Sequence, residues 1–246
     1  MNNHLSMRSG NPALQASTFK NHLTSSIDSK MTLSGTVNKT GISLFLVIIS
    51  AGFTWGNPAM HVMMLPAGII GFILALATVF KPTIGHITVP AYAVAQGILL
   101  GVISMYFNTM FPGIVVQAVF LTFGTLGALL LAYKSGLIAA TENFKLGVAA
   151  ATGGIAILYL INFVMGFFGT GISIISSNNN MGILFSGFVV VIAALNLVLD
   201  FDFIEEGAEM GAPKYMEWYG AFGLLVTLIW LYLEILRLLA KLQSRR

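Results

Sequence analysis

Residues 146–199 read LGVAAATGGIAILYLINFVMGFFGTGISIISSNNNMGILFSGFVVVIAALNLVL and contain no Asp, Glu, Lys or Arg. Two further stretches, 40–80 and 82–133, also lack all four residue types. A helix that crosses the hydrocarbon core needs roughly 20 mostly apolar residues, so each stretch has room for at least one. A charged side chain at mid-bilayer costs at least about 2.5–3.5 kcal/mol. Charge-free stretches of this length therefore predict membrane-spanning helices.

The composition of the whole chain excludes most soluble classes of protein. Its 246 residues are 57% hydrophobic and 9% charged, whereas an average soluble domain is about 45–50% apolar and about 25% charged. So few charged side chains cannot cover the surface of a water-soluble protein of this size. Because the chain has no Cys, disulfide frameworks, thiolate metal sites and Cys nucleophiles are excluded as well.

Seven apolar segments separated by polar breaks predict the fold. We expect an all-α polytopic membrane protein, built as a bundle of seven transmembrane helices within a membrane domain over 41–246. Proline and asparagine at the breaks stop helices or favour turns. The predicted spans are 41–56, 62–80, 88–107, 113–133, 146–168, 181–199 and 218–240. The first is short, and Leu33–Val37 could extend it.

Small residues indicate where helices approach closely. Gly97 and Gly101 are four residues apart, as are Ala150 and Gly154, and such pairs favour close packing of helices within a bundle or, alternatively, a dimer face. The last span contains Gly220, Gly223, Thr227 and Glu234, which are poor choices for a lipid-facing surface. We therefore expect the last span at the centre of the bundle.

The first 40 residues are polar, rich in Asn, Ser and Thr, and lack the apolar run of a signal peptide. We expect a flexible N-terminal tail over residues 1–40, with a short amphipathic piece near 13–19. The basic balance of the chain reflects this tail, so binding of nucleic acid is not expected. The tail holds a net charge of +3 from Arg8, Lys20, Lys30 and Lys39 against Asp28.

The distribution of Lys and Arg predicts the orientation of the chain. With the N-terminus in the cytoplasm, Lys81, Lys134, Lys145 and Lys214 all fall on the cytoplasmic side. The opposite loops, 57–61, 108–112 and 169–180, carry no charge. This asymmetry is typical of multi-pass proteins of the cell membrane.

The cations at the end of the chain conflict with this orientation. Seven crossings place Arg237, Lys241, Arg245 and Arg246 on the outside. Either packing holds the last span in a direction that its charges disfavour, or the last span re-enters the membrane and the number of crossings is effectively even.

The sequence lacks the usual motifs of intramembrane hydrolases. It has no His-Glu-x-x-His zinc motif and no Gly-x-Ser-x-Gly elbow. Glu205-Glu206 is similar to the start of the Glu-Glu-x-x-x-Arg motif of prenyl-peptide proteases, but Met210 stands at the arginine position. We expect neither enzyme activity nor a bound cofactor.

The acidic residues are concentrated in one segment, NLVLDFDFIEEGAEMGAPKYME at 196–217, which holds six of the nine. Asp200 directly follows the sixth apolar run, so we expect it at the cytoplasmic boundary of the membrane. Two carboxylates that approach each other there would titrate as a coupled pair, and oxygen ligands suit calcium. Asp200 is thus a candidate pH sensor, and Asp200 with Asp202 a candidate cation site. The alternative is a solvent-facing acidic loop.

A second isolated acid, Glu234, lies inside the last span. It follows Trp218 by sixteen residues, about 24 Å along a helix. Arg237 is three residues further on, hence on the same face. Glu234 is therefore either half of a local ion pair or a residue of a pore or gate, since intramembrane ionisable groups are functional candidates.

The chain resembles the Bax inhibitor-1 family, in its bacterial YccA-like branch. The number and spacing of the spans agree, Met64-Leu65-Pro66 looks like a family element, and residues 199–204 (LDFDFI) are similar to the family's Tyr-Asp-x-x-x-Ile. The resemblance implies a seven-helix fold with a central last helix, and a pH-sensitive calcium leak gated by an aspartate pair between the sixth and seventh helices. Some bacterial relatives are instead linked to a membrane-bound AAA protease, and animal relatives to suppression of cell death.

The resemblance maps Asp200 onto the first aspartate of the pair and leaves two candidates for the second. Leu231-Tyr232-Leu233-Glu234 resembles the family's Leu-Tyr-Leu-Asp, which makes Glu234 the partner. Aligning Arg237 with the arginine near the end of many members places Thr227 there instead. An acid on the second span of some calcium-leaking members falls on Gly71. Two functions remain open, a cation leak and an interaction protein that modulates a membrane protease or stress response.

Overall fold

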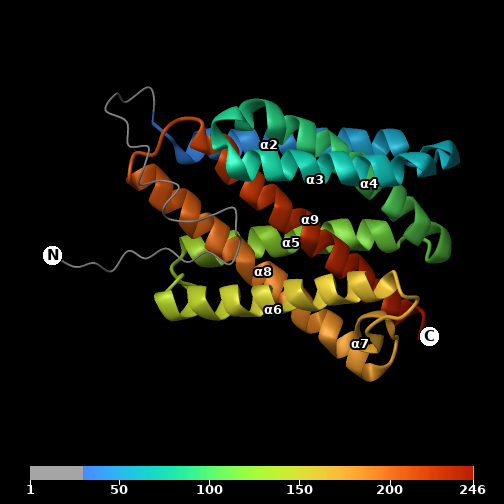
Figure 1. Ribbon diagram of the computed structural model, residues 1–246. Coiled ribbons are helices and arrows are strands. Elements are labelled where there is room, and N and C mark those ends of the chain that lie inside the picture. The colour runs from blue at the N-terminus through green and yellow to red at the C-terminus, as the bar shows by residue number, and fades with distance from the viewer. Residues whose placement is uncertain (1–29, 246) are drawn as a thin grey trace. The chain divides into compact units, whose positions relative to one another are not determined.

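The computed structural model describes residues 30–245, and the helices dominate it (Figure 1). Within these residues, seven helices are long and apolar enough to cross a membrane, and the sole strand-like pairing is an isolated bridge between Lys30 and Pro213. The prediction of an all-α polytopic membrane protein is therefore confirmed. The long helices are α2 (Leu33–Thr54), α3 (Met64–Phe80), α4 (Gly85–Met110), α5 (Ile114–Lys134), α6 (Glu142–Gly166), α8 (Asn180–Glu209) and α9 (Met216–Gln243).

Three short helices complete the described chain. Two 3-10 helices, η2 (Pro58–Met63) and η3 (Pro82–Ile84), precede α3 and α4. Each begins with proline, whose fixed φ suits the first position of a helix. One turn of helix, α7 (Ser173–Ser176), lies in the connection between α6 and α8, where the sequence predicted a loop.

The described residues divide into two compact units. The N-terminal unit comprises residues 30–112 and 202–226, and the C-terminal unit comprises residues 113–201 and 227–245. Helices α8 and α9 each contribute one part to both units.

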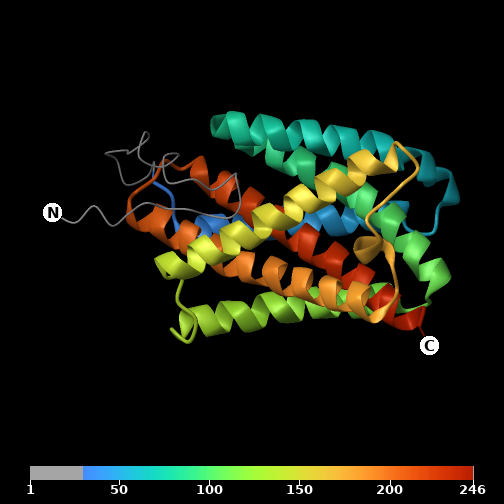
Figure 2. The ribbon, with the colours of Figure 1, turned by 60° about the horizontal axis from the view of Figure 1, so that its bottom comes forward.

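In the N-terminal unit, α4 packs against both α2 and α3 (Figures 1 and 2). The contact with α2 is close because α4 presents glycine: a Cβ on Gly97 would overlap Ser50, and one on Gly101 would overlap Thr54. Thr54 Oγ1 also donates to the Ile98 carbonyl at 3.4 Å. The predicted role of this glycine pair in helix packing is confirmed.

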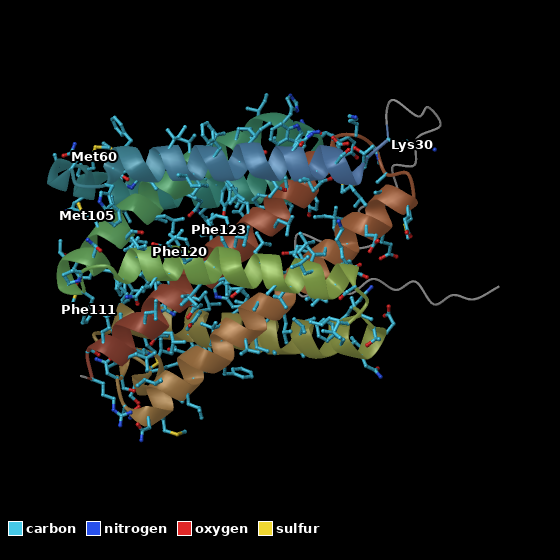
Figure 3. The ribbon with its side chains drawn as sticks, turned by 180° about the vertical axis from the view of Figure 1, so that it is seen from behind. Lys30, Met60, Met105, Phe111, Phe120 and Phe123 are labelled. Atoms are coloured by element: carbon cyan, nitrogen blue, oxygen red, sulfur yellow. The ribbon has the colours of Figure 1, made fainter. Side chains whose placement is uncertain are left out.

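In the C-terminal unit, Ile155 of α6 packs with Val189 and Ile192 of α8, and Trp230 of α9 covers this cluster. The outer faces are apolar: on α5, Phe120 and Phe123 are exposed (Figure 3), as a lipid-facing surface requires. Helix α6 is the least buried of the seven spans. A side chain added at Gly154 would meet no neighbour, so this glycine does not serve packing within the unit.

The start of the first span differs from the prediction. Helix α2 begins at Leu33 rather than at residue 41, because Thr32 caps it: Thr32 Oγ1 accepts from the Gly35 N–H at 3.0 Å. Residues 33–40 are therefore helix rather than tail. Residues 1–29 of the predicted tail, which include the amphipathic piece, lie outside the described residues.

The end of the sixth span also differs. Helix α8 does not stop before Asp200 but runs on to Glu209, so the segment predicted as an acidic loop is mostly helical. The loop proper is confined to the residues between Glu209 and Met216.

Helix α9 has the largest buried share of the seven spans, which agrees with the expectation that its surface is not mainly lipid-facing. It is continuous over 28 residues, about 42 Å. A re-entrant last span would need a turn within this length, so that alternative is wrong.

Candidate functional site

Asp200 is the most deeply buried of the predicted site residues. It is 0% exposed, and it lies inside α8, which continues past it to Glu209. One turn earlier on the same face, Asn196 is buried as well, and its Nδ2 donates to Thr152 Oγ1 and to the Ile192 carbonyl, both at 2.8 Å. Helix α8 thus has a buried polar face of Asn196 and Asp200. The solvent-facing interpretation is wrong for Asp200.

Asp202, the second candidate for the cation site, is half-buried. It follows Asp200 by two residues in a continuous helix, and residues two apart do not face each other. Within residues 30–245, no three His, Asp or Glu side chains gather as ligands for a metal ion. A shared cation at Asp200 and Asp202 therefore needs ligands from outside α8.

Glu234 forms a compact triad with Tyr159 of α6 and Arg237. The Tyr159 hydroxyl donates to Glu234 Oε1 at 3.0 Å, and Arg237 Nη1 donates to the same oxygen at 2.9 Å. Arg237 also donates to the Tyr159 hydroxyl at 2.7 Å, and its guanidinium lies 5.2 Å from the centre of the tyrosine ring. The second carboxylate oxygen, Glu234 Oε2, also accepts from the Tyr159 hydroxyl and from Arg237 Nη1. The geometry is that of the local ion pair predicted as one alternative.

Thr227, the other candidate partner of Asp200, is 3% exposed. It precedes Glu234 by seven residues on α9, about 10 Å along the axis. The two candidates therefore lie at different depths, and a side chain at one depth cannot contact both. Which of them faces Asp200 stays a prediction.

A further buried acid, Glu217, was not selected from the sequence. It lies in the first turn of α9, where the helix dipole favours a negative charge. Its side chain is 0% exposed and is paired with Lys39 of α2 and, at 3.7 Å, with Lys214. Thr32 donates its N–H to Glu217 Oε1 at 3.0 Å and its hydroxyl at 2.9 Å. A buried carboxylate with these partners joins the start of α2 to the start of α9.

Several close contacts reinforce this junction. A Cβ on Gly35 would overlap the Glu217 carboxylate, so a larger residue at 35 would displace that carboxylate from its present position. The Lys39 ammonium lies 5.6 Å from the centre of the Trp218 ring. The Met31 N–H donates to the Ala212 carbonyl at 2.6 Å, beside the bridge that Lys30 makes. Figure 3 places Lys30 at one end of the N-terminal unit, with Met60 and Met105 at the opposite end.

A third polar cluster lies at the end of α9, next to α7 (Figures 1 and 2). Lys241 Nζ donates to the Ile175 carbonyl at 2.7 Å and to the Gly182 carbonyl at 3.1 Å. Arg245 donates to Asn180 Oδ1. The terminal cations Arg237, Lys241 and Arg245 are thus each held by contacts within the C-terminal unit. Such contacts are what the first of the two predicted alternatives requires, in which packing holds the last span against the preference of its charges.

Apolar outer faces together with buried ionisable side chains define the chain as a polytopic α-helical membrane protein. The sequence matches the family described as Bax inhibitor 1 like over residues 11–244. The match covers nearly the whole chain, so the chain belongs to this family, and the resemblance drawn from its motifs is confirmed. Comparison with curated proteins and with solved structures gave no match.

Proposed function

We propose that the chain is a pH-sensitive cation leak, permeable to calcium, in which Asp200 is the gate residue. The observation that carries the proposal is the burial of the Asp200 carboxylate within a helix long enough to cross the membrane. A buried carboxylate is tolerated while it is protonated or paired. Deprotonation leaves a negative charge, which hydration stabilises. The open state, in which water reaches Asp200, therefore gains population as pH rises.

Thr227 is the preferred partner of Asp200 in this proposal. Both oxygens of Glu234 already accept from Tyr159 and Arg237, so Glu234 has its own counter-charge. If Glu234 were nevertheless the partner, two like charges about 4 Å apart would repel by roughly 4 kcal/mol at an effective dielectric of about 20. That repulsion would make the pair share a proton.

The test is calcium flux into liposomes that contain only the purified protein, measured at two pH values. Wild type should leak faster at the higher pH. Asp200→Asn keeps the shape but removes the titration, so its flux should be the same at both. Glu209→Gln, which changes an exposed acid of the same helix, should behave as wild type. Thr227→Val should alter the pH response, whereas Glu234→Gln should not. Absence of flux in wild type at both pH values contradicts the proposal.

The alternative function is a non-conducting interaction protein that modulates a membrane-bound AAA protease or a stress response. It needs a partner, whereas a leak does not, so the liposome experiment separates the two. For either function we propose a bacterial plasma membrane, a cytoplasmic N-terminus and no enzyme activity. The YccA-like branch is the proposed subgroup within the family.

A further inference from the structure

Three buried polar residues lie along one face of the part of α9 that belongs to the C-terminal unit. Thr227, Glu234 and Lys241 are each seven residues apart, and seven residues are almost two full turns of a helix. Their exposed fractions are 3%, 2% and 5%. Ionisable side chains within a span are costly and mark ion pathways or their seals. This polar face of α9 begins at the proposed partner of Asp200 and ends at Lys241.

Lys241 is the unusual member of the polar face. Glu234 has Arg237 as a counter-charge, but the Lys241 ammonium is held by two backbone carbonyls, those of Ile175 and Gly182, at 2.7 and 3.1 Å. Removing an ammonium from water costs several kcal/mol. Carbonyl oxygens can replace its hydration shell, as they do for metal cations in the selectivity filters of channels.

Contacts within the chain shape the backbone that supplies the two carbonyls. Asn179 caps the start of α8: its Oδ1 accepts from the Gly182 N–H at 2.8 Å and from the Ser177 hydroxyl at 2.9 Å. A Cβ on Gly182 would overlap the Ser177 carbonyl, so the chain can approach this closely only with glycine at 182. The Ser177 N–H donates to the Ser173 carbonyl at 2.7 Å and closes the turn of α7. The backbone around the two carbonyls is thus shaped by contacts that do not involve Lys241.

We propose that the carbonyl oxygens of Ile175 and Gly182 form a site for a monovalent cation of the ammonium class, and that Lys241 fills it from within as a tethered blocking cation. The positive charge at this end of the polar face repels an ion that has passed Asp200. The blocking role rests on the proposed leak function. The carbonyl site does not depend on the leak function, so it has a separate test.

The site is tested by chemical rescue in detergent. Lys241→Ala should lower the melting temperature, and n-propylammonium chloride should restore much of the loss, whereas sodium chloride at equal ionic strength should not. Lys81→Ala, which removes an exposed lysine, should show no rescue. If propylammonium and sodium act alike on Lys241→Ala, the carbonyl site is wrong.

The blocking role is tested by flux in liposomes. Lys241→Met, of similar length but uncharged, should raise the leak about tenfold, the effect of removing a like charge about 12 Å from the ion at an effective dielectric of about 20. Millimolar propylammonium should suppress the extra leak of Lys241→Ala and leave wild type unchanged. If Lys241→Met leaks as wild type while Asp200→Asn still abolishes the pH response, the block is wrong and the leak stands. If no variant leaks at either pH, the leak fails and the block fails with it, while the rescue experiment still decides the carbonyl site.

Discussion

Glu217 illustrates at the scale of one residue how much a buried charge depends on its partners. The side chain is fully buried and accepts from Lys39 and from Thr32. Glu217→Gln keeps the size but leaves the lysines without their counter-charge. We expect a loss of about 3 kcal/mol, the low end for breaking a buried ion pair, measured by denaturant unfolding in detergent micelles.

The matched control for this prediction is Glu142→Gln. Glu142 also pairs with a lysine, Lys145, but at 4.0 Å and with its side chain 51% exposed. A pair of this kind contributes about 0–1 kcal/mol. If the two variants lose the same stability, Glu217 is no structural junction.

The sequence located Asp200 but not Glu217, for a physical reason. Asp200 directly follows an apolar run, so its unusual solvation is visible along the chain. Glu217 is buried by Thr32 and Lys39, which are 185 and 178 residues away, and no local pattern reports such a pairing. The one local signal was an acid in the first turn of an apolar helix, which also occurs at solvated helix starts. Asn196 was missed similarly, since its partner Thr152 lies on another helix.

At the scale of elements, the packing of α4 on α2 depends on glycine. Gly97→Ala places a methyl group into Ser50 and the Val47 carbonyl. Overpacking of this kind costs about 1–3 kcal/mol, and we expect that loss in thermal unfolding in detergent.

Gly147→Ala on α6 is the control for the helical environment. A Cβ there would meet nothing within 4 Å, and alanine favours a helix over glycine by about 1 kcal/mol. This variant should be neutral or slightly more stable. A gain in stability for Gly97→Ala would contradict close packing of α2 on α4.

The boundaries of the helices could be predicted where an apolar run ends in proline or lysine. The prediction was wrong at the end of α8, where acidic residues continue the helix. Helix α8 ends at Glu209 because Gly211 takes φ 69° and the Ala212 N–H donates to the Gly207 carbonyl at 3.0 Å. Gly211 and Pro213 are ordinary stop signals in the sequence. The acids before them end the apolar run, which predicts a loop, but Asp and Glu can also continue a helix, as they do here up to Glu209.

At the scale of the whole molecule, the chain lacks cysteine, which allows its orientation to be measured directly. Single cysteines at positions 81, 134 and 214 should react with a membrane-impermeant maleimide only after the cells are opened. Cysteines at 108 and 170, in the uncharged loops, should react from outside. External labelling at any of the first three positions would overturn the proposed topology.

The junction between Lys39 and Glu217 also has a consequence for the order of biogenesis. Their separation of 178 residues corresponds to about 10–35 s of synthesis at the usual rate. Throughout this interval Lys39 is a charge without its final partner at the start of the first span, and it can direct insertion of that span. The arrival of Glu217 with the last span then neutralises it. We expect this one lysine to orient the first span during insertion and to pair with Glu217 once the last span is in place.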